Sequence, residues 1–336
     1  MISKGTIVLL SAVCGAALLG LAGLWLVEQE LVARAGEGLA LVATGIADKL
    51  DAMLRERNGD IEIIARAPQV RGTDAAQVTR HLHAVQASYP VYSRLAVTNQ
   101  AGRVVASTDE NWVGKDFHHV SWYQAVRQAP RVHAETVRAS GEVAGQLRAV
   151  VFSAPISDTN GTFLGVVMTE VDRTTWAGLV EESVNQFSAR TESFGIAHYR
   201  VLSYDGAVLL PFRQEEPSSL NLRDMGLPSA AKVATGQSGY VEEEHLIKKI
   251  PVVTGYARMN GVRSLVSLKW GLLVRAERAD VLASIHGRLV KVGLLGLVGF
   301  MVMLAALVWT NHRHQQEQVR TAGAERARAD GEERLR

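Results

Sequence analysis

Histidine and carboxylate side chains gather at three places in the sequence, and such groups could hold a metal ion. His118 and His119 follow Asp116, residues 81–83 are His-Leu-His, and residues 242–245 are Glu-Glu-Glu-His. A metal site needs converging ligands, and two histidines separated by one residue do not share a face of a helix. These groups are more typical of solvated histidines and an exposed acidic turn, so we predict no metal ion and no other cofactor.

Motifs of known catalytic sites are missing from the sequence. It contains no GxxxxGK[ST] phosphate-binding loop, no GxSxG nucleophile elbow, no HExxH motif and no set of kinase motifs. The net charge of +2 over 336 residues also disfavours a nucleic-acid-binding protein, because phosphate contacts call for a basic excess. We therefore expect neither an enzyme nor a nucleic-acid partner.

Two apolar stretches are long enough to cross a membrane. Residues 6–27 contain no charge, and residues 292–309 form a second uncharged run. About 20 helical residues span a hydrocarbon core of about 30 Å. A cleaved signal peptide is the alternative for the first stretch, but its apolar run exceeds the usual length of about 7–15 residues. We expect transmembrane helices at 6–27 and 289–310, and the only cysteine, Cys14, lies in the first.

The charges beside these stretches favour cytoplasmic termini. Lys4 precedes the first stretch and Arg313 follows the second, whereas Glu28 lies just beyond the first. We expect residues 1–5 and 311–336 in the cytoplasm and the chain between the spans in the periplasm. A periplasmic domain without cysteine has no disulfide and must be held by its own core. The predicted location is the inner membrane of a bacterium.

A long amphipathic helix is predicted after the first span. Between Leu31 and Ile64 apolar residues recur at steps of three and four, with charges between them. We assign residues 28–80 to this stalk region. Further along, a shorter helix is expected from Ser121, as its N-cap, to Gln128.

An internal repeat follows the stalk. Residues 97–105 and 201–209, two short β runs around a glycine turn, match at an offset of 104, and residues 165–171 and 271–277 match at an offset of 106. Two matches in the same order indicate two similar modules. We predict an α+β fold in which two tandem modules with antiparallel sheets occupy residues 81–190 and 191–288.

Several short motifs, taken in order, resemble the double Cache sensor domain. They are LRERNGDI at 54–61, the NQAG hairpin at 99–102, Ser-Trp-Tyr at 121–123, APISDTNGTFLGVV at 154–167, VTGYAR at 253–258 and WGLLV at 270–274. The resemblance covers about residues 28–288. It implies two PAS-like modules on a long N-terminal helix between two membrane spans, with a small extracellular ligand in the membrane-distal module.

The resemblance also indicates candidate ligand-binding residues. Trp122 and Tyr123 match a Trp-Tyr pair of amino-acid-binding members. The arginine that holds the ligand carboxylate there is Val120 here, and the aspartate that holds the ammonium is Glu170. Losing a bidentate arginine is not a small change, although Arg138 could supply a cation. The candidate set is Trp122, Tyr123, Arg138, Phe152 and Glu170, and an amino-acid ligand is not supported. Alternatively, the Trp-Tyr pair closes the module core.

The resemblance implies a receptor that passes a signal through the second span to a histidine kinase, diguanylate cyclase or chemotaxis module. Residues 311–336 are charged and helix-forming, as expected for the start of a signalling helix or coiled coil in a homodimer. The output module would follow this chain or belong to a partner. The alternative is a membrane-anchored protein-interaction module without a small-molecule ligand, for which a large exposed apolar patch would be expected.

Overall fold

The computed structural model describes residues 4–140, 144–190, 197–211, 220–261 and 268–283, together with helical residues between 291 and 316. Only the backbone is described for residues 4–14, 17 and 190. The chain divides into two units, Met1–Leu282 and Ala283–Arg336. Both sheets, and the helices that cover them, belong to the first unit.

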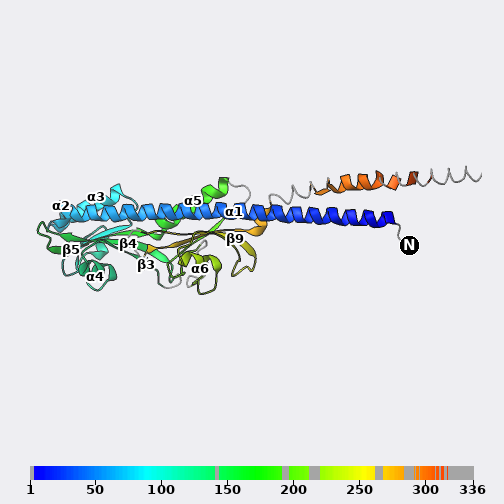
Figure 1. Ribbon diagram of the computed structural model, residues 1–336. Helices are drawn as coiled ribbons and strands as arrows, with labels where there is room; N and C mark the ends of the chain where they lie inside the picture. Colours follow the sequence, from blue (N-terminus) through cyan, green and yellow to red (C-terminus); the bar gives the residue numbers. More distant parts are fainter. Residues whose placement is uncertain are drawn as a thin grey trace, which may run out of the picture. The chain divides into compact units, whose positions relative to one another are not determined.

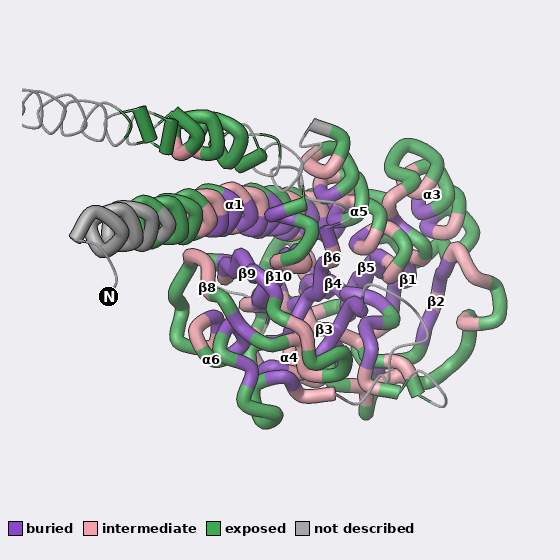
Figure 2. The backbone as a smooth tube through the Cα atoms, turned by 90° about the vertical axis from the view of Figure 1, so that its right-hand side faces the viewer, coloured by how far each residue is buried: buried purple, intermediate pink, exposed green. Residues whose placement is uncertain are grey.

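The first helix is the longest element. Helix α1 runs from Lys4 to Arg66, and its side facing the sheets is buried while its opposite side is exposed (Figure 2). The predicted positions Leu39, Ile46, Leu50, Leu54 and Ile61 are at most 1% exposed. The three- and four-residue spacing therefore identified the buried side of the helix. Two short helices follow, α2 (Pro68–Arg71) and α3 (Ala75–Ser88).

The first sheet has five antiparallel strands in the order β2-β1-β5-β4-β3. Their bounds are β1 Arg94–Thr98, β2 Val104–Ser107, β3 His133–Arg138, β4 Leu147–Ser157 and β5 Phe163–Asp172. The 3-10 helix η1 (Glu110–Trp112) and helix α4 (Ser121–Gln128) lie between β2 and β3. The sequence predicts Ser121 as the N-cap of α4, but the structure makes it the first residue of the helix. Val120 is the N-cap, and the Ser121 hydroxyl donates to Glu135 Oε1 at 2.6 Å.

Helix α5 (Arg173–Arg190) leads to a second five-stranded sheet, in the order β7-β6-β10-β9-β8. Its strands are β6 His198–Leu202, β7 Val208–Leu210, β8 Gly239–Glu244, β9 Pro251–Arg258 and β10 Gly271–Glu277, with helix α6 at Pro228–Ala234. The order matches that of the first sheet when β6–β10 are equated with β1–β5. The predicted repeat is therefore a repeat of sheet topology.

The strand register corrects one part of that repeat. Both hairpins carry an irregularity at equivalent places, between Val97 and Thr98 and between Val201 and Leu202, which supports the offset of 104. In the central strands, however, Glu170 lies opposite Arg94 while Arg275 lies opposite His198. Because His198 follows Arg94 by 104 positions and Arg275 follows Glu170 by 105, the predicted offset of 106 is wrong by one residue. A shift of one residue turns every side chain to the other face.

Helices cover both faces of the sheets (Figure 1). Helices α1, α3 and α5 lie on one face, and α4 and α6 lie on the other. Buried side chains of α1 and of both sheets form one continuous apolar cluster. Tyr92 donates to Asp60 Oδ2 of α1 at 2.8 Å, and Asp51 of α1 accepts the Asn260 and Gly261 amides at 2.8 and 3.0 Å. One helix is thus anchored to both modules.

Among the residues whose side chains are described, no helix is both long and apolar enough to cross a membrane. The expected spans, 6–27 and 289–310, and the expected cytoplasmic segments, 1–5 and 311–336, lie wholly or partly outside those residues. The boundaries expected for the stalk and the modules, 28–80, 81–190 and 191–288, stay predictions.

Candidate ligand-binding face of the first module

The candidate residues from the sequence centre on the face of the first sheet that is turned away from α1, here called the outer face. Helix α4 covers it, and buried residues of the sheet and of α4 form a small apolar cluster there. The cluster members are Ala96, Val104, Trp122, Tyr123, Val126, Val151, Val166 and Met168. This face is separate from the larger cluster around α1 because the side chains of a strand alternate between its two faces.

Trp122 and Tyr123 are core residues of this face. Their side chains are 4% and 0% exposed, and their rings meet edge to face with centroids 6.2 Å apart. Phe117 continues the series, 6.0 Å from Trp122 and 4.8 Å from Trp112. The Tyr123 hydroxyl donates to the Gln100 carbonyl at 2.7 Å, which satisfies the polar end of a buried ring. Both rings are therefore part of the packed core on this face of the first module.

Glu170 lies on the same face and is surrounded by arginines. Arg94 on β1 donates to Glu170 Oε2 at 3.3 Å, and Arg148 on β4 approaches the same oxygen at 3.5 Å. Arg94 also contacts Asp109 Oδ2 at 3.3 Å, and its guanidinium lies 4.2 Å from the centre of the Trp112 ring. We call these five residues the arginine–glutamate cluster. Cations stacked on an aromatic face and paired with carboxylates are held in fixed orientations.

The local strand geometry explains how this cluster assembles. Arg94 lies directly opposite Glu170 in the β1–β5 register. On β4, the pairing with β3 skips Arg148, since Val137 pairs with Ala149 and Arg138 pairs with Leu147. A bulge of this kind re-aims a side chain, and here it brings Arg148 to Glu170. Glu170 is 8% exposed whereas Arg148 is 50% exposed, so Arg148 is the member most open to solvent.

Phe152 and Arg138 do not join this site. Phe152 belongs to the cluster packed around α1 on the opposite face of the sheet, because it follows the outer-face residue Val151 by one position. Arg138 stands at the end of β3, with its Nη2 atom 3.9 Å from Oδ1 of Asp205, a residue of the second module. The structure therefore does not bring these two residues together with Trp122, Tyr123 and Glu170.

The histidine and acidic groups of the sequence have other partners. His118 bonds to Asp116 Oδ1 through its backbone amide at 2.9 Å and through its ring at 2.8 Å, and these bonds lower the pKa of Asp116. The acidic run is not the exposed turn that we expected. It forms strand β8, in which Glu243 is buried and accepts the Ser229 amide and hydroxyl at 2.9 and 2.8 Å. In the described part of the chain no group of three or more His, Cys, Asp or Glu could hold a metal.

Sequence reasoning missed Arg94, Arg148, Asp109 and Trp112. One signal was available, since Arg148 interrupts the apolar run from Leu147 to Phe152, and a lone arginine inside a buried strand needs a partner. The partner itself is set by strand register and by the bulge, which the sequence pattern does not specify.

Comparison with known proteins agrees with this architecture. The Cache domain family matches residues 27–285 of the sequence. The chain belongs to the Cache domain family. Its tandem sheets on one helix are therefore the two modules of a double Cache domain. No curated protein sequence matches the chain.

Solved structures with this fold include several receptor domains. An extracellular ligand-binding receptor from Desulfohalobium retbaense is 13% identical with a TM-score of 0.54, over 71% of this chain and 40% of that one. Two amino-acid chemoreceptor domains of Pseudomonas aeruginosa are also similar. The PctC domain in complex with GABA is 18% identical with a TM-score of 0.51, over 72% of this chain and 99% of that one. The PctB domain in complex with L-Arg is 16% identical with a TM-score of 0.53, over 75% of this chain and 92% of that one. Extracellular domains assigned to histidine kinases share the fold as well.

Proposed function

We propose that the chain is a two-pass receptor whose periplasmic double Cache domain binds a small extracellular ligand and passes the signal to a cytoplasmic output module. The observation that carries the proposal is the position of the Cache region, residues 27–285, between the apolar stretches 6–27 and 292–309. Helix α1 continues from the modules into the first stretch. In the sequence, the second stretch follows β10.

An ion pair joins α1 to the residue that follows β10. Arg278, the residue after β10, lies 3.7 Å from Glu28 Oε2 of α1 and 3.4 Å from Glu242 Oε2 of β8. A shift of α1 against the second sheet would strain this contact. A ligand produces such a shift only if it binds the two arrangements with different affinity. The output module proposed here is a histidine kinase or diguanylate cyclase, reached through residues 311–336.

We place the ligand on the outer face of the first module, at the arginine–glutamate cluster beside Trp122 and Tyr123. The chemoreceptor domains that share the fold were solved with GABA and L-Arg, but this chain does not favour the amino-acid clamp. Val120 has no charge, and Glu170 already contacts two arginines. Its carboxylate would have to exchange those partners for a ligand ammonium. Arg148, half exposed and 3.5 Å from Glu170, is the residue that we assign to a ligand carboxylate.

A homodimer is part of this proposal. The side of α1 turned away from the sheets exposes Leu41 and Ile63, at 74% and 72% of their surfaces. Apolar side chains on an exposed helix face favour pairing with a second helix. This dimer would align both copies of the first span.

The purified full chain in detergent tests the ligand site. It would be screened by thermal shift against the twenty amino acids, GABA and short mono- and dicarboxylates. A stabilising compound should lose most of its effect in Arg148→Gln and Glu170→Gln, and keep it in Arg131→Gln, an exposed arginine outside the cluster. The outer-face site is refuted if no compound stabilises the wild type, or if the cluster variants are stabilised as much as Arg131→Gln. Either result favours the alternative, a protein-interaction module without a small-molecule ligand.

A further inference from the structure

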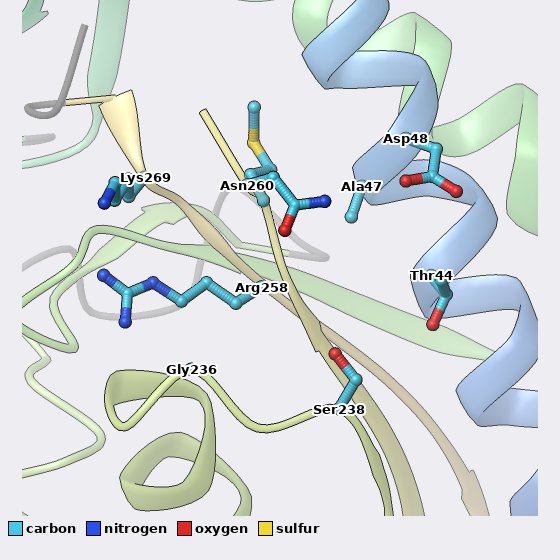
Figure 3. Close-up of a pocket in the computed structure, with 9 residues that line it drawn as sticks. Thr44, Ala47, Asp48, Gly236, Ser238, Arg258, Asn260 and Lys269 are labelled. Carbon is cyan, nitrogen blue, oxygen red and sulfur yellow. The ribbon is translucent and has the colours of Figure 1, made fainter. Parts of the chain in front are cut away.

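A second site is suggested by a polar cavity of about 280 Å³ at the end of the second sheet, where α1 meets β9 (Figure 3). Three segments line it: α1, the turn between α6 and β8, and the chain around the end of β9 and the start of β10. Its polar lining residues are Thr44, Asp48, Ser238, Arg258, Asn260 and Lys269. None of them belongs to the first module, so this cavity is distinct from the outer-face site.

The walls of the cavity are held in place by hydrogen bonds. Asp51, which is 2% exposed, accepts the backbone amides of Asn260 and Gly261 and thereby fixes the end of β9 to α1. Arg258 Nη1 donates to the Ala234 carbonyl at the end of α6, at 3.1 Å. A cavity with fixed walls binds a ligand without an added cost of ordering them.

The charges in the cavity are unevenly placed. In Figure 3 the Arg258 and Lys269 side chains lie on the side of the strand away from α1, whereas Thr44 and Asp48 lie on α1. Within the described residues, one donor of Arg258 bonds to the protein, and the guanidinium has four more that could bond to a ligand. Within the described residues, Lys269 and Asp48 form no ion pair. The lining therefore offers two cations on one side and a single carboxylate on the other.

These groups define the chemistry of an occupant. A guanidinium and an ammonium together favour a carboxylate. Asp48 is an acceptor only, and Asn260 and Ser238 can donate and accept, so the remainder of the ligand should carry hydroxyl groups. The cavity volume of about 280 Å³ lies just below the range of about 300–1,000 Å³ for small-molecule sites, so the ligand should be small. An apolar ligand would leave this polar lining without partners.

We propose that the cavity binds a small polyhydroxylated carboxylate, a compound of the sugar-acid class. Arg258 and Lys269 hold its carboxylate, and Asp48, Asn260 and Ser238 hold its hydroxyls. Because the lining comes from both α1 and the second sheet, the bound ligand bridges the two and favours one position of α1 against the second module. The binding site does not depend on the outer-face ligand or on the output module of the proposed function.

Titration calorimetry of the full chain in detergent tests the site, with gluconate as the probe. Sorbitol has the hydroxyls without the carboxylate, and hexanoate has the carboxylate without the hydroxyls. Gluconate should bind, and both analogues should bind at least about tenfold more weakly, because each lacks hydrogen bonds to charged groups. The absence of heat or thermal stabilisation with millimolar gluconate would overturn the proposal, as would equal binding of either analogue.

Three variants test whether gluconate binds in this cavity. Lys269→Gln should weaken gluconate binding about tenfold or more, whereas Lys232→Gln, in α6 outside the cavity, should leave it unchanged. Arg148→Gln should also leave it unchanged, since Arg148 belongs to the first module. If gluconate binding is lost in Arg148→Gln and kept in Lys269→Gln, the sugar acid belongs to the outer face and the second site is refuted, while the proposed function stands.

Discussion

A series of glycine substitutions tests whether α1 and the second sheet are in direct backbone contact. A Cβ atom built on Gly255 of β9 would lie less than 3.0 Å from backbone atoms of Leu39 and Ala40 in α1. A Cβ on Gly36 would lie equally close to the Tyr240 ring, including its Cγ atom, so that this whole side chain would have to shift. A Cβ on Gly45 would meet nothing within 4 Å. The three positions therefore probe a rigid neighbour, a movable neighbour and open space.

The expected stabilities follow from these neighbours. Ordinary contact begins at 3.4 Å, so Gly255→Ala must separate strand and helix by about 1 Å, at a cost of about 1–3 kcal/mol for an overpacked core. Gly45→Ala should gain about 1 kcal/mol of helix propensity. In Gly36→Ala the same gain is offset by moving Tyr240. At about 2–4 °C per kcal/mol, we expect Gly255→Ala to melt about 2–12 °C below wild type and Gly45→Ala about 2–4 °C above it.

The assay is the apparent melting temperature of the detergent-solubilised chain, followed by tryptophan fluorescence. Gly45→Ala and Gly36→Ala serve as controls because each adds the same methyl group, but to α1, the helix that Gly255 of β9 contacts. The predicted order of melting temperatures is Gly45→Ala, Gly36→Ala, Gly255→Ala, from highest to lowest. A Gly255→Ala variant as stable as Gly36→Ala would refute the close approach of β9 to α1.

Three further predictions concern single side chains. Asp172 accepts the Thr175 amide at 3.1 Å at the start of α5, so Asp172→Ala should cost about 1 kcal/mol in denaturant unfolding as a lost N-cap, and an unchanged midpoint would contradict this. Asp51→Ala leaves the Asn260 and Gly261 amides without their acceptor and should cost about 2–4 kcal/mol, with Asp51→Asn intermediate. Burial, together with Lys248 and Arg200, lowers the pKa of His198 below 6.5. The unfolded chain therefore takes up this proton first, and stability should fall as the pH drops below about 6.5. His198→Gln should flatten that decline in melting curves at pH 7 and 5, and an identical decline in the variant would exclude His198 as its source.

The sequence identified elements well where one face of an element is exposed. The buried side of α1 followed from the spacing of Leu39, Ile46, Leu50 and Leu54, because solvent-facing charges separate them. Gly102 and Gly206 in the hairpin turns adopt positive φ angles of 85° and 95°. Such turns favour glycine because it has no Cβ to oppose a positive φ. Repeated hairpins of this kind made the duplication visible.

Strands buried on both faces were harder to place. From Ala149 to Ala154 every residue of β4 is buried, so no alternation indicates which face each side chain takes. The resemblance groups Phe152 with Trp122 and Glu170, whereas its neighbour Val151 is the residue that lies on their face. The one-residue error in the repeat has the same cause, since β5 and β10 are buried along nearly their whole length. Arg148 reaches Glu170 only through a bulge, which local composition does not predict.

The apolar cluster that α1 shares with both sheets limits how receptors of this kind can be recombined. A chimera that exchanged one module at the α5 junction would keep the native α1. The buried side chains of that helix are matched to the sheet of the module that was removed. Part of the helix would then pack against a sheet to which its buried side chains are not matched. Functional hybrids should instead be joined outside the stretch from Glu28 to Arg278, so that both sheets and the helix between them are inherited together.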